Sequence, residues 1–215
     1  MAREGVVPPS LPSAVLYVRA PETLPRDIPT DQEVARMIRS CDTMRTTGFR
    51  DRAIVELLYS TGMRRQEMTD LKVGDVDLAQ GYARIERGKG GKGRIVPLGR
   101  MAGDWIRKYL LAIRPELVRG KPDPGWLFVT KSGRKMDGAE VRQAVLKAAR
   151  RAGIEKNVTP HALRRTCATH LIASGASAWA VKGILGHSDF KSLGRYVSLG
   201  LKELREIHEK THPRA

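Results

Sequence analysis

The sequence predicts a mainly helical α+β domain that contains a small antiparallel sheet of three strands. Apolar residues at helical spacing follow capping signals through most of the chain, whereas residues 76–98 show the pattern of short strands. A length of 215 residues with a hydrophobic content of 41% is enough for one domain with its own core. We expect residues 30–215 to form that domain.

The first 29 residues differ from the rest in composition. They show no sustained apolar period and hold half of the chain's 12 prolines: Pro8, Pro9, Pro12, Pro21, Pro25 and Pro29. A proline-rich arm or linker is therefore expected to precede the domain.

Capping and stop signals define the first helices. Thr30 and Glu33 form a capping box ahead of an apolar series at helical spacing. A second helix is expected to stop at Gly62, and a short third one to cover residues 64–71.

The pattern then changes to strands. Residues 76–78, 82–87 and 94–98 are expected to pair as the sheet, with a glycine-rich loop at 88–93 before the last strand. A helix that Pro115 ends should follow, and residues 126–129 suit a short extended piece.

The C-terminal half of the chain is predicted to be helical. Asp137 with Glu140 caps one helix that is apolar on one side and basic on the other, a face suited to phosphates or simply to solvent. Thr159 and Pro160 begin another that should run to Gly175. A third is expected between Ser177 and Gly186, and a last one has an apolar side made of Leu201, Leu204, Ile207 and His208.

Charge and cysteine content narrow the class of protein. The net charge of +16 and pI near 10.4 favour a polyanionic partner. A membrane is the competing partner, but no apolar run approaches the roughly 18 residues needed to span one, and no N-terminal signal is evident. Cys41 and Cys167 lie in helical patterns without metal-type spacing, so we expect buried thiols in a cytoplasmic, DNA-binding protein with no metal site.

Several side chains suit phosphodiester chemistry. Arg64 and Arg164 offer planar, always-charged forks for two phosphate oxygens, and Glu67 lies where it can hold Arg64 by an ion pair. Tyr196 can attack phosphorus once its proton is accepted, and Lys89 carries a proton for the leaving oxygen. His161 lies near Arg164 on one helix face, whereas His170 falls on another side.

Five segments in order resemble the motifs of the tyrosine recombinases, the phage-integrase family. They are TGMR at 61–64 with Glu67 after it, GKG at 88–90 followed by RIVPL at 94–98, PHALR at 160–164, LGHSD at 185–189, and Tyr196. Taken singly, His161, His187 and Tyr196 are more simply capping or core residues, and the glycine loop a plain turn. Their joint order favours the family, and the resemblance runs from about Thr30 to the last helix.

The resemblance implies a fold like the tyrosine-recombinase catalytic domain and a specific reaction. Tyr196 would attack a DNA phosphodiester to give a 3′-phosphotyrosine and a free 5′-hydroxyl, and another 5′-hydroxyl would reseal the strand. Arg64, Arg164 and His187 would stabilise the transition state, Lys89 would protonate the leaving oxygen, and His161 would manage the tyrosine proton. Neither metal nor ATP is implied.

It also implies partners. Four protomers would pair two duplex DNA sites, with a monomer expected in the absence of DNA, and Leu201, Leu204 and Ile207 would dock on a neighbour. The residues expected to contact DNA are Lys92, Arg94, Lys131, Arg134, Lys135, Arg142 and Arg165.

Alternatives stay open at this point. Most members carry a helical DNA-clamping domain before the catalytic one, whereas here only the arm precedes Thr30, so we expect no such domain, in either a short recombinase or a fragment. A non-catalytic DNA-binding or regulatory protein on the same fold is a second reading, although no motif residue is replaced. A type IB topoisomerase is a third, disfavoured by the helix after Tyr196.

Overall fold

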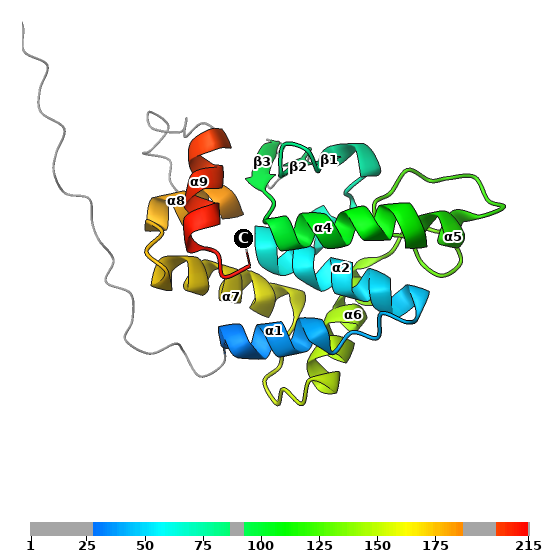
Figure 1. Cartoon of the computed structure of the whole chain (residues 1–215), viewed down its shortest axis with the longest axis horizontal. Helices are drawn as coiled ribbons and strands as arrows, with labels where there is room; N and C mark the ends of the chain where they lie inside the picture. Colours follow the sequence, from blue (N-terminus) through cyan, green and yellow to red (C-terminus); the bar gives the residue numbers. More distant parts are fainter. Residues whose placement is uncertain (1–27, 87–92, 187–200, 215) are drawn as a thin grey trace, which may run out of the picture.

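The helix α2 (Thr46–Thr61) forms the centre of the molecule (Figure 1). The computed structural model describes residues 28–86, 93–186 and 201–214, and within them α2 packs against α4, α6 and α7. All of its residues from Ala53 to Thr61 are buried, which is typical of a helix segment enclosed on every side. The C-terminal end of α2 is therefore fixed relative to the surrounding helices.

The remaining helices surround this centre. Their bounds are α1 (Asp31–Arg39), α3 (Arg65–Thr69), η1 (Val73–Asp75), α4 (Arg100–Lys108), η2 (Tyr109–Ile113), α5 (Arg114–Val118), α6 (Gly138–Arg151), α7 (Pro160–Ala173), α8 (Ala178–Leu185) and α9 (Leu201–Thr211). The predicted capping boxes of Thr30 with Glu33 and of Asp137 with Glu140 are both present. Gly62 and Gly186 end α2 and α8 in the left-handed conformation, as predicted.

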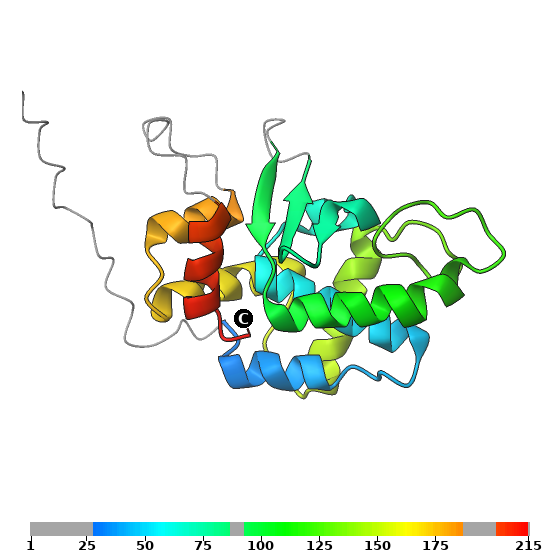
Figure 2. The same cartoon turned by 45° about the horizontal axis from the view of Figure 1, so that its top comes forward.

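The sheet is antiparallel with the order β1-β2-β3, which confirms the predicted fold class (Figure 2). Its strands are β1 (Val76–Asp77), β2 (Tyr82–Ile85) and β3 (Arg94–Pro97), slightly shorter than expected. Residues 126–129 contribute only the isolated bridges Lys72–Trp126 and Val129–Lys135.

The prediction that Pro115 ends its helix is wrong. The helix α4 continues through a π-helical turn, η2, into α5, and Pro115 lies in the first turn of α5. Proline has the backbone φ of a helix, and its missing N–H matters little at a position where the donor is not needed. The helical path therefore extends to Val118.

The C-terminal helix α9 lies against β3, α7 and α8 of its own chain (Figures 1 and 2). Ile207 packs against the core and His208 is buried. The side chains of Leu201 and Leu204 lie outside the described residues. In the single chain Ile207 thus packs inward, and the docking of Leu201, Leu204 and Ile207 on a neighbouring protomer stays a prediction.

Cys41 and Cys167 are buried free thiols, as predicted. Burial raises the pKa of the Cys41 thiol to about 11 and that of Cys167 to about 12, so both stay protonated at neutral pH. Among the described residues, no helix combines the length and apolar character needed to cross a membrane.

Candidate active site

Arg64 is fixed by the turn between α2 and α3. Gly62 adopts a φ of 57°, and a Cβ atom there would lie 2.4 Å from a Leu185 side-chain carbon, so α2 ends against α8. Arg64 then precedes α3, and its backbone N–H donates to Glu67 Oε2 at 2.7 Å. Its guanidinium donates to Glu67 Oε1 at 2.9 Å and to the Gly186 carbonyl at 3.1 Å. Both ends of the residue are therefore held while 30% of the side chain stays exposed.

Arg164 is held by the carboxyl ends of two helices. It lies on α7 with only 6% of the residue exposed, and its terminal nitrogens donate to the carbonyls of Gly62 at 2.6 Å and Leu185 at 2.9 Å. These carbonyls carry the partial negative charge of the ends of α2 and α8, which favours a cation there. Burial, and then the positive charge of Arg64, lower the pKa of Arg164 to about 10. Arg164 therefore stays charged at neutral pH, and a bound anion would offset the repulsion.

Glu67 is the carboxylate that these cations share. Its side chain is 4% exposed and accepts hydrogen bonds from Arg64 and, at 2.7 and 2.8 Å, from both terminal nitrogens of Arg94. Burial raises the pKa of Glu67, but the hydrogen bonds from Arg94 and Arg64 outweigh it, and the pKa is lowered. Two guanidinium groups thus bind one buried carboxylate, and the charge of Arg164 acts on the same group, which leaves the site positive.

His161 completes the part of the site that the structure describes. It is exposed near the start of α7 and lines, with both arginines, a cleft of about 490 Å³. The cleft residues are Met63, Arg64, Arg65, Gln66, Arg142, Thr159, Pro160, His161 and Arg164. The predicted residues Arg64, His161, Arg164 and Arg142 therefore meet at one surface. Arg65 joins them, and the sequence analysis missed it although it directly follows Arg64.

The other predicted catalytic residues, Lys89, His187 and Tyr196, lie outside the described residues, as does Lys92. Gly186 is the last described residue before His187, and its carbonyl accepts a hydrogen bond from Arg64. These four residues stay predictions.

The predicted DNA contacts have different surroundings. Lys131 and Arg165 are exposed, Arg134 pairs with Glu140 at 2.7 Å, and Lys135 lies 3.9 Å from the centre of the Trp126 ring. Arg94 differs from these residues because it pairs with Glu67 in the candidate active site, and 14% of its side chain is exposed. No local spacing rule relates residue 94 to residue 67, so this pairing was not visible in the sequence.

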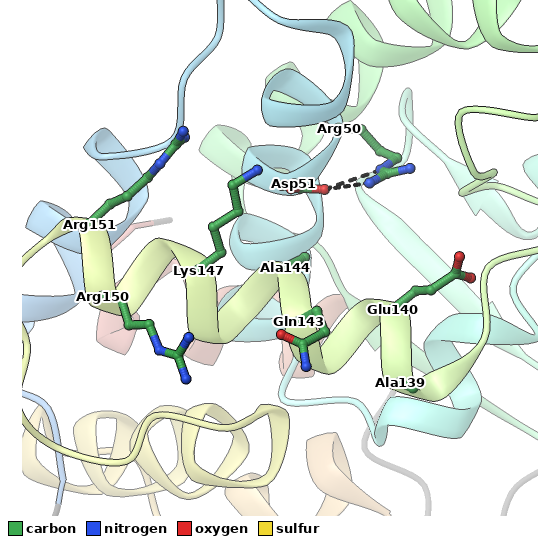
Figure 3. A pocket seen from close by; sticks show the side chains of 9 residues that line it. All are labelled: Arg50, Asp51, Ala139, Glu140, Gln143, Ala144, Lys147, Arg150 and Arg151. Carbon is green, nitrogen blue, oxygen red and sulfur yellow. Dashed lines mark hydrogen bonds and ion pairs between the residues drawn. The ribbon is translucent and has the colours of Figure 1, made fainter.

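A second hollow of about 530 Å³ lies on the other side of α6 (Figure 3). It is lined by Lys147, Arg150 and Arg151 of α6 and by Arg50 of α2, whose guanidinium is paired with Asp51. Lys147 lies about 140° around the helix from Arg142, which faces the cleft. The basic side of α6 is therefore divided between two surfaces.

Comparison with known proteins places this arrangement in a family. Residues 29–202 match the profile of the phage integrase family. Tyrosine recombinase XerC 2 of Ralstonia nicotianae is 37% identical over 213 residues, which cover 99% of this chain and 61% of the relative. Tyrosine recombinase XerD of Staphylococcus saprophyticus is 35% identical over 189 residues, which cover 88% of this chain and 63% of the relative.

Solved structures agree with this result. The crystal structure of XerA recombinase has a TM-score of 0.67 at 30% identity, covering 90% of this chain and 68% of that one. The lambda integrase catalytic core has a TM-score of 0.55 at 19% identity, which is evidence for the fold alone. The chain spans less than two thirds of the length of the curated relatives described above. It belongs to the phage integrase family and has the fold of a tyrosine recombinase catalytic domain.

Proposed function

We propose that this chain is a site-specific DNA recombinase that cleaves and rejoins strands through a 3′-phosphotyrosine intermediate. The observation that carries the proposal is the meeting of Arg64, Arg164 and His161 at one positively charged cleft. Two of its relatives are named tyrosine recombinases. The XerH recombinase, 29% identical, is described as bound to its difH substrate, which supports DNA as the partner here.

The arginines act on the phosphate. Their guanidinium groups bind its two non-bridging oxygens and stabilise the negative charge that develops as phosphorus becomes five-coordinate. Because Glu67 and the carbonyls of Gly62 and Leu185 hold these groups from behind, little reorganisation is needed when substrate binds.

The remaining steps use residues assigned from the sequence. The phenol oxygen of Tyr196 forms a bond to phosphorus, its proton passes to His161, and the bond from phosphorus to the 5′-oxygen breaks. Lys89 gives that oxygen a proton, and His187 donates to the phosphate. Attack by a 5′-hydroxyl of another duplex reverses the sequence and releases Tyr196. Four protomers on two paired sites would bring the two duplexes together.

A trapping experiment tests the function. The chain is incubated with a library of nicked duplexes of randomised sequence, from which the cut fragment diffuses away, and covalent complexes are recovered in detergent and sequenced. We expect an adduct at a defined site, and none with Tyr196→Phe. Strand exchange between two recovered sites indicates a recombinase, supercoil relaxation without exchange a topoisomerase, and binding without adduct a non-catalytic protein. Light scattering of the recovered complex measures the number of protomers.

The orientation of α6 gives a prediction about DNA affinity. Arg142→Ala is expected to weaken binding and to reduce the slope of log K against log salt by about 0.9, the value for one phosphate contact. Lys147→Ala removes one charge from an exposed site on the same helix, but at the second hollow, and should leave the slope unchanged (Figure 3). Equal effects of the two variants would show that the affinity depends on net charge and not on a contact at the cleft.

A further inference from the structure

Arg94 lies where three parts of the candidate active site meet. It is the first residue of β3, the strand that follows the loop carrying Lys89. Its terminal nitrogens form the bidentate pair with Glu67, and its Nε lies 3.4 Å from the carbonyl of Ile184 near the end of α8. One side chain of β3 therefore contacts both α3, at the partner of Arg64, and the end of α8.

The side chain of Arg94 lies so close to Gly186 that no larger residue fits there without a shift. Its φ of 67° favours glycine, and a Cβ atom there would lie 2.7 Å from the Cδ and Nε atoms of Arg94. The same glycine accepts the hydrogen bond from Arg64 and directly precedes His187 in the sequence. The close approach of Arg94 to the end of α8 therefore depends on glycine at position 186.

We propose that Arg94 is a positioning residue: through Glu67 it fixes the guanidinium of Arg64, and through its contact with the Ile184 carbonyl, beside Gly186, it fixes the end of α8. This inference rests on the proposed function and replaces the DNA contact expected for Arg94 from the sequence. Each nitrogen of its guanidinium already faces a protein oxygen, and little of the side chain is exposed.

The physical basis is the geometry of the shared carboxylate. Without Arg94, the hydrogen bonds given above for the carboxylate of Glu67 would come from Arg64 alone, through its backbone N–H and its guanidinium, so the carboxylate and the Arg64 side chain could shift together. The fork of Arg94 binds both oxygens of Glu67 and so fixes the plane of the carboxylate. The acceptor that Arg64 uses then has one position, and displacement of a catalytic group by about 1 Å can cost about 100-fold in rate.

The test compares the rate of adduct formation at saturating DNA with DNA affinity. Arg94→Ala is expected to slow adduct formation by about 100-fold, with the dissociation constant and its salt dependence unchanged. Arg94→Lys keeps the charge but not the two-pronged guanidinium, and its rate of adduct formation should fall between those of Arg94→Ala and wild type.

In a double-mutant cycle that combines Arg94→Ala with Glu67→Gln, the double variant should be no slower than the slower single variant. Additive losses, or a salt slope that falls while the rate recovers at saturation, would overturn the proposal.

Arg50→Ala is the matched control. Arg50 and Asp51 form a pair of similar burial, with side chains 11% and 9% exposed, beside the second hollow (Figure 3). Its loss should lower the unfolding temperature as Arg94→Ala does, but leave the adduct rate per folded molecule unchanged. If Arg94→Ala does not fold, Arg94→Lys carries the comparison.

A second measurement does not depend on turnover. The rate at which an arginine-selective dicarbonyl modifies Arg64, located by mass spectrometry, should rise several-fold in Arg94→Ala and not in Arg50→Ala. An unchanged rate would overturn the positioning role even if the wild-type chain formed no adduct. Absence of the wild-type adduct with a raised modification rate would instead refute the proposed function alone.

Discussion

Arg164→Ala is expected to slow covalent adduct formation by about 10³-fold at saturating DNA, because removal of one fixed donor to a developing oxyanion costs about 10²–10³-fold and here a full charge is lost as well. The side chain is buried between the ends of α2 and α8, so no neighbouring arginine can move into its place without leaving its own partners. The measurement is single-turnover trapping at a DNA concentration well above the dissociation constant.

The control separates charge from geometry. Arg164→Lys keeps a positive charge but cannot span the carbonyls of Gly62 and Leu185 and also face the phosphate, so it should recover DNA binding and only a small part of the rate. Arg164→Ala leaves the carbonyls of Gly62 and Leu185 without these donors and Arg164→Lys leaves at least one of them so, at a cost of about 1–3 kcal/mol for each carbonyl, so rates are compared per folded molecule. A wild-type rate in Arg164→Lys would show that charge alone is required.

The sequence predicted those elements whose signals are local. Capping boxes at Thr30 and Asp137 and left-handed glycines at positions 62 and 186 act over one helical turn, and each was found where predicted. The continuation of the helix through Pro115 was not predictable, because the π-helical turn before it depends on packing, which leaves no pattern in the residues themselves.

The partners of buried polar groups were not predictable in this way. Arg94 looked like a surface cation, and only the fold brings it to Glu67, 27 positions earlier in the chain. His208 was placed correctly on the apolar side of the last helix, but its hydrogen bond to the Ser60 carbonyl at 2.6 Å joins segments 148 positions apart. The motif order could indicate a phosphate site, but not which groups hold its arginines in place.

The C-terminal segment gives the second large prediction, a loss of stability in acid. His212 directly follows α9 and is buried. Its Nε2 lies 3.0 Å from the Tyr59 carbonyl, and its Nδ1 accepts the Arg214 backbone N–H at 3.1 Å. These contacts require a neutral ring that donates from Nε2. A proton added at Nδ1 would face the Arg214 N–H, donor against donor, so the fold opposes ionisation.

Burial and the charges around this ring also lower the pKa of His212. Burial first, and then the neighbouring His208, lower the pKa of His212 to about 3, and burial also lowers the pKa values of His208 and His170. His208 stacks on His212 at 4.6 Å, and Arg214, paired with Glu56, adds a further positive charge. The folded chain therefore binds fewer protons here than the unfolded chain.

The sign of the pH effect follows from linkage. The contribution of a histidine with a depressed folded-state pKa is complete above the unfolded value of about 6.5 and declines as the pH falls below it. At about 1.4 kcal/mol per pH unit, His212 alone should remove about 3 kcal/mol of unfolding free energy between pH 7 and pH 4. Urea unfolding at a series of pH values measures it.

A variant isolates this histidine from the carboxylates that also destabilise the fold in acid. His212→Gln can still donate to the Tyr59 carbonyl but cannot ionise, so its stability should fall less steeply than that of wild type between pH 6 and pH 4, while its stability at pH 7 is somewhat lower. Parallel slopes for wild type and His212→Gln would show that protonation of His212 does not oppose folding.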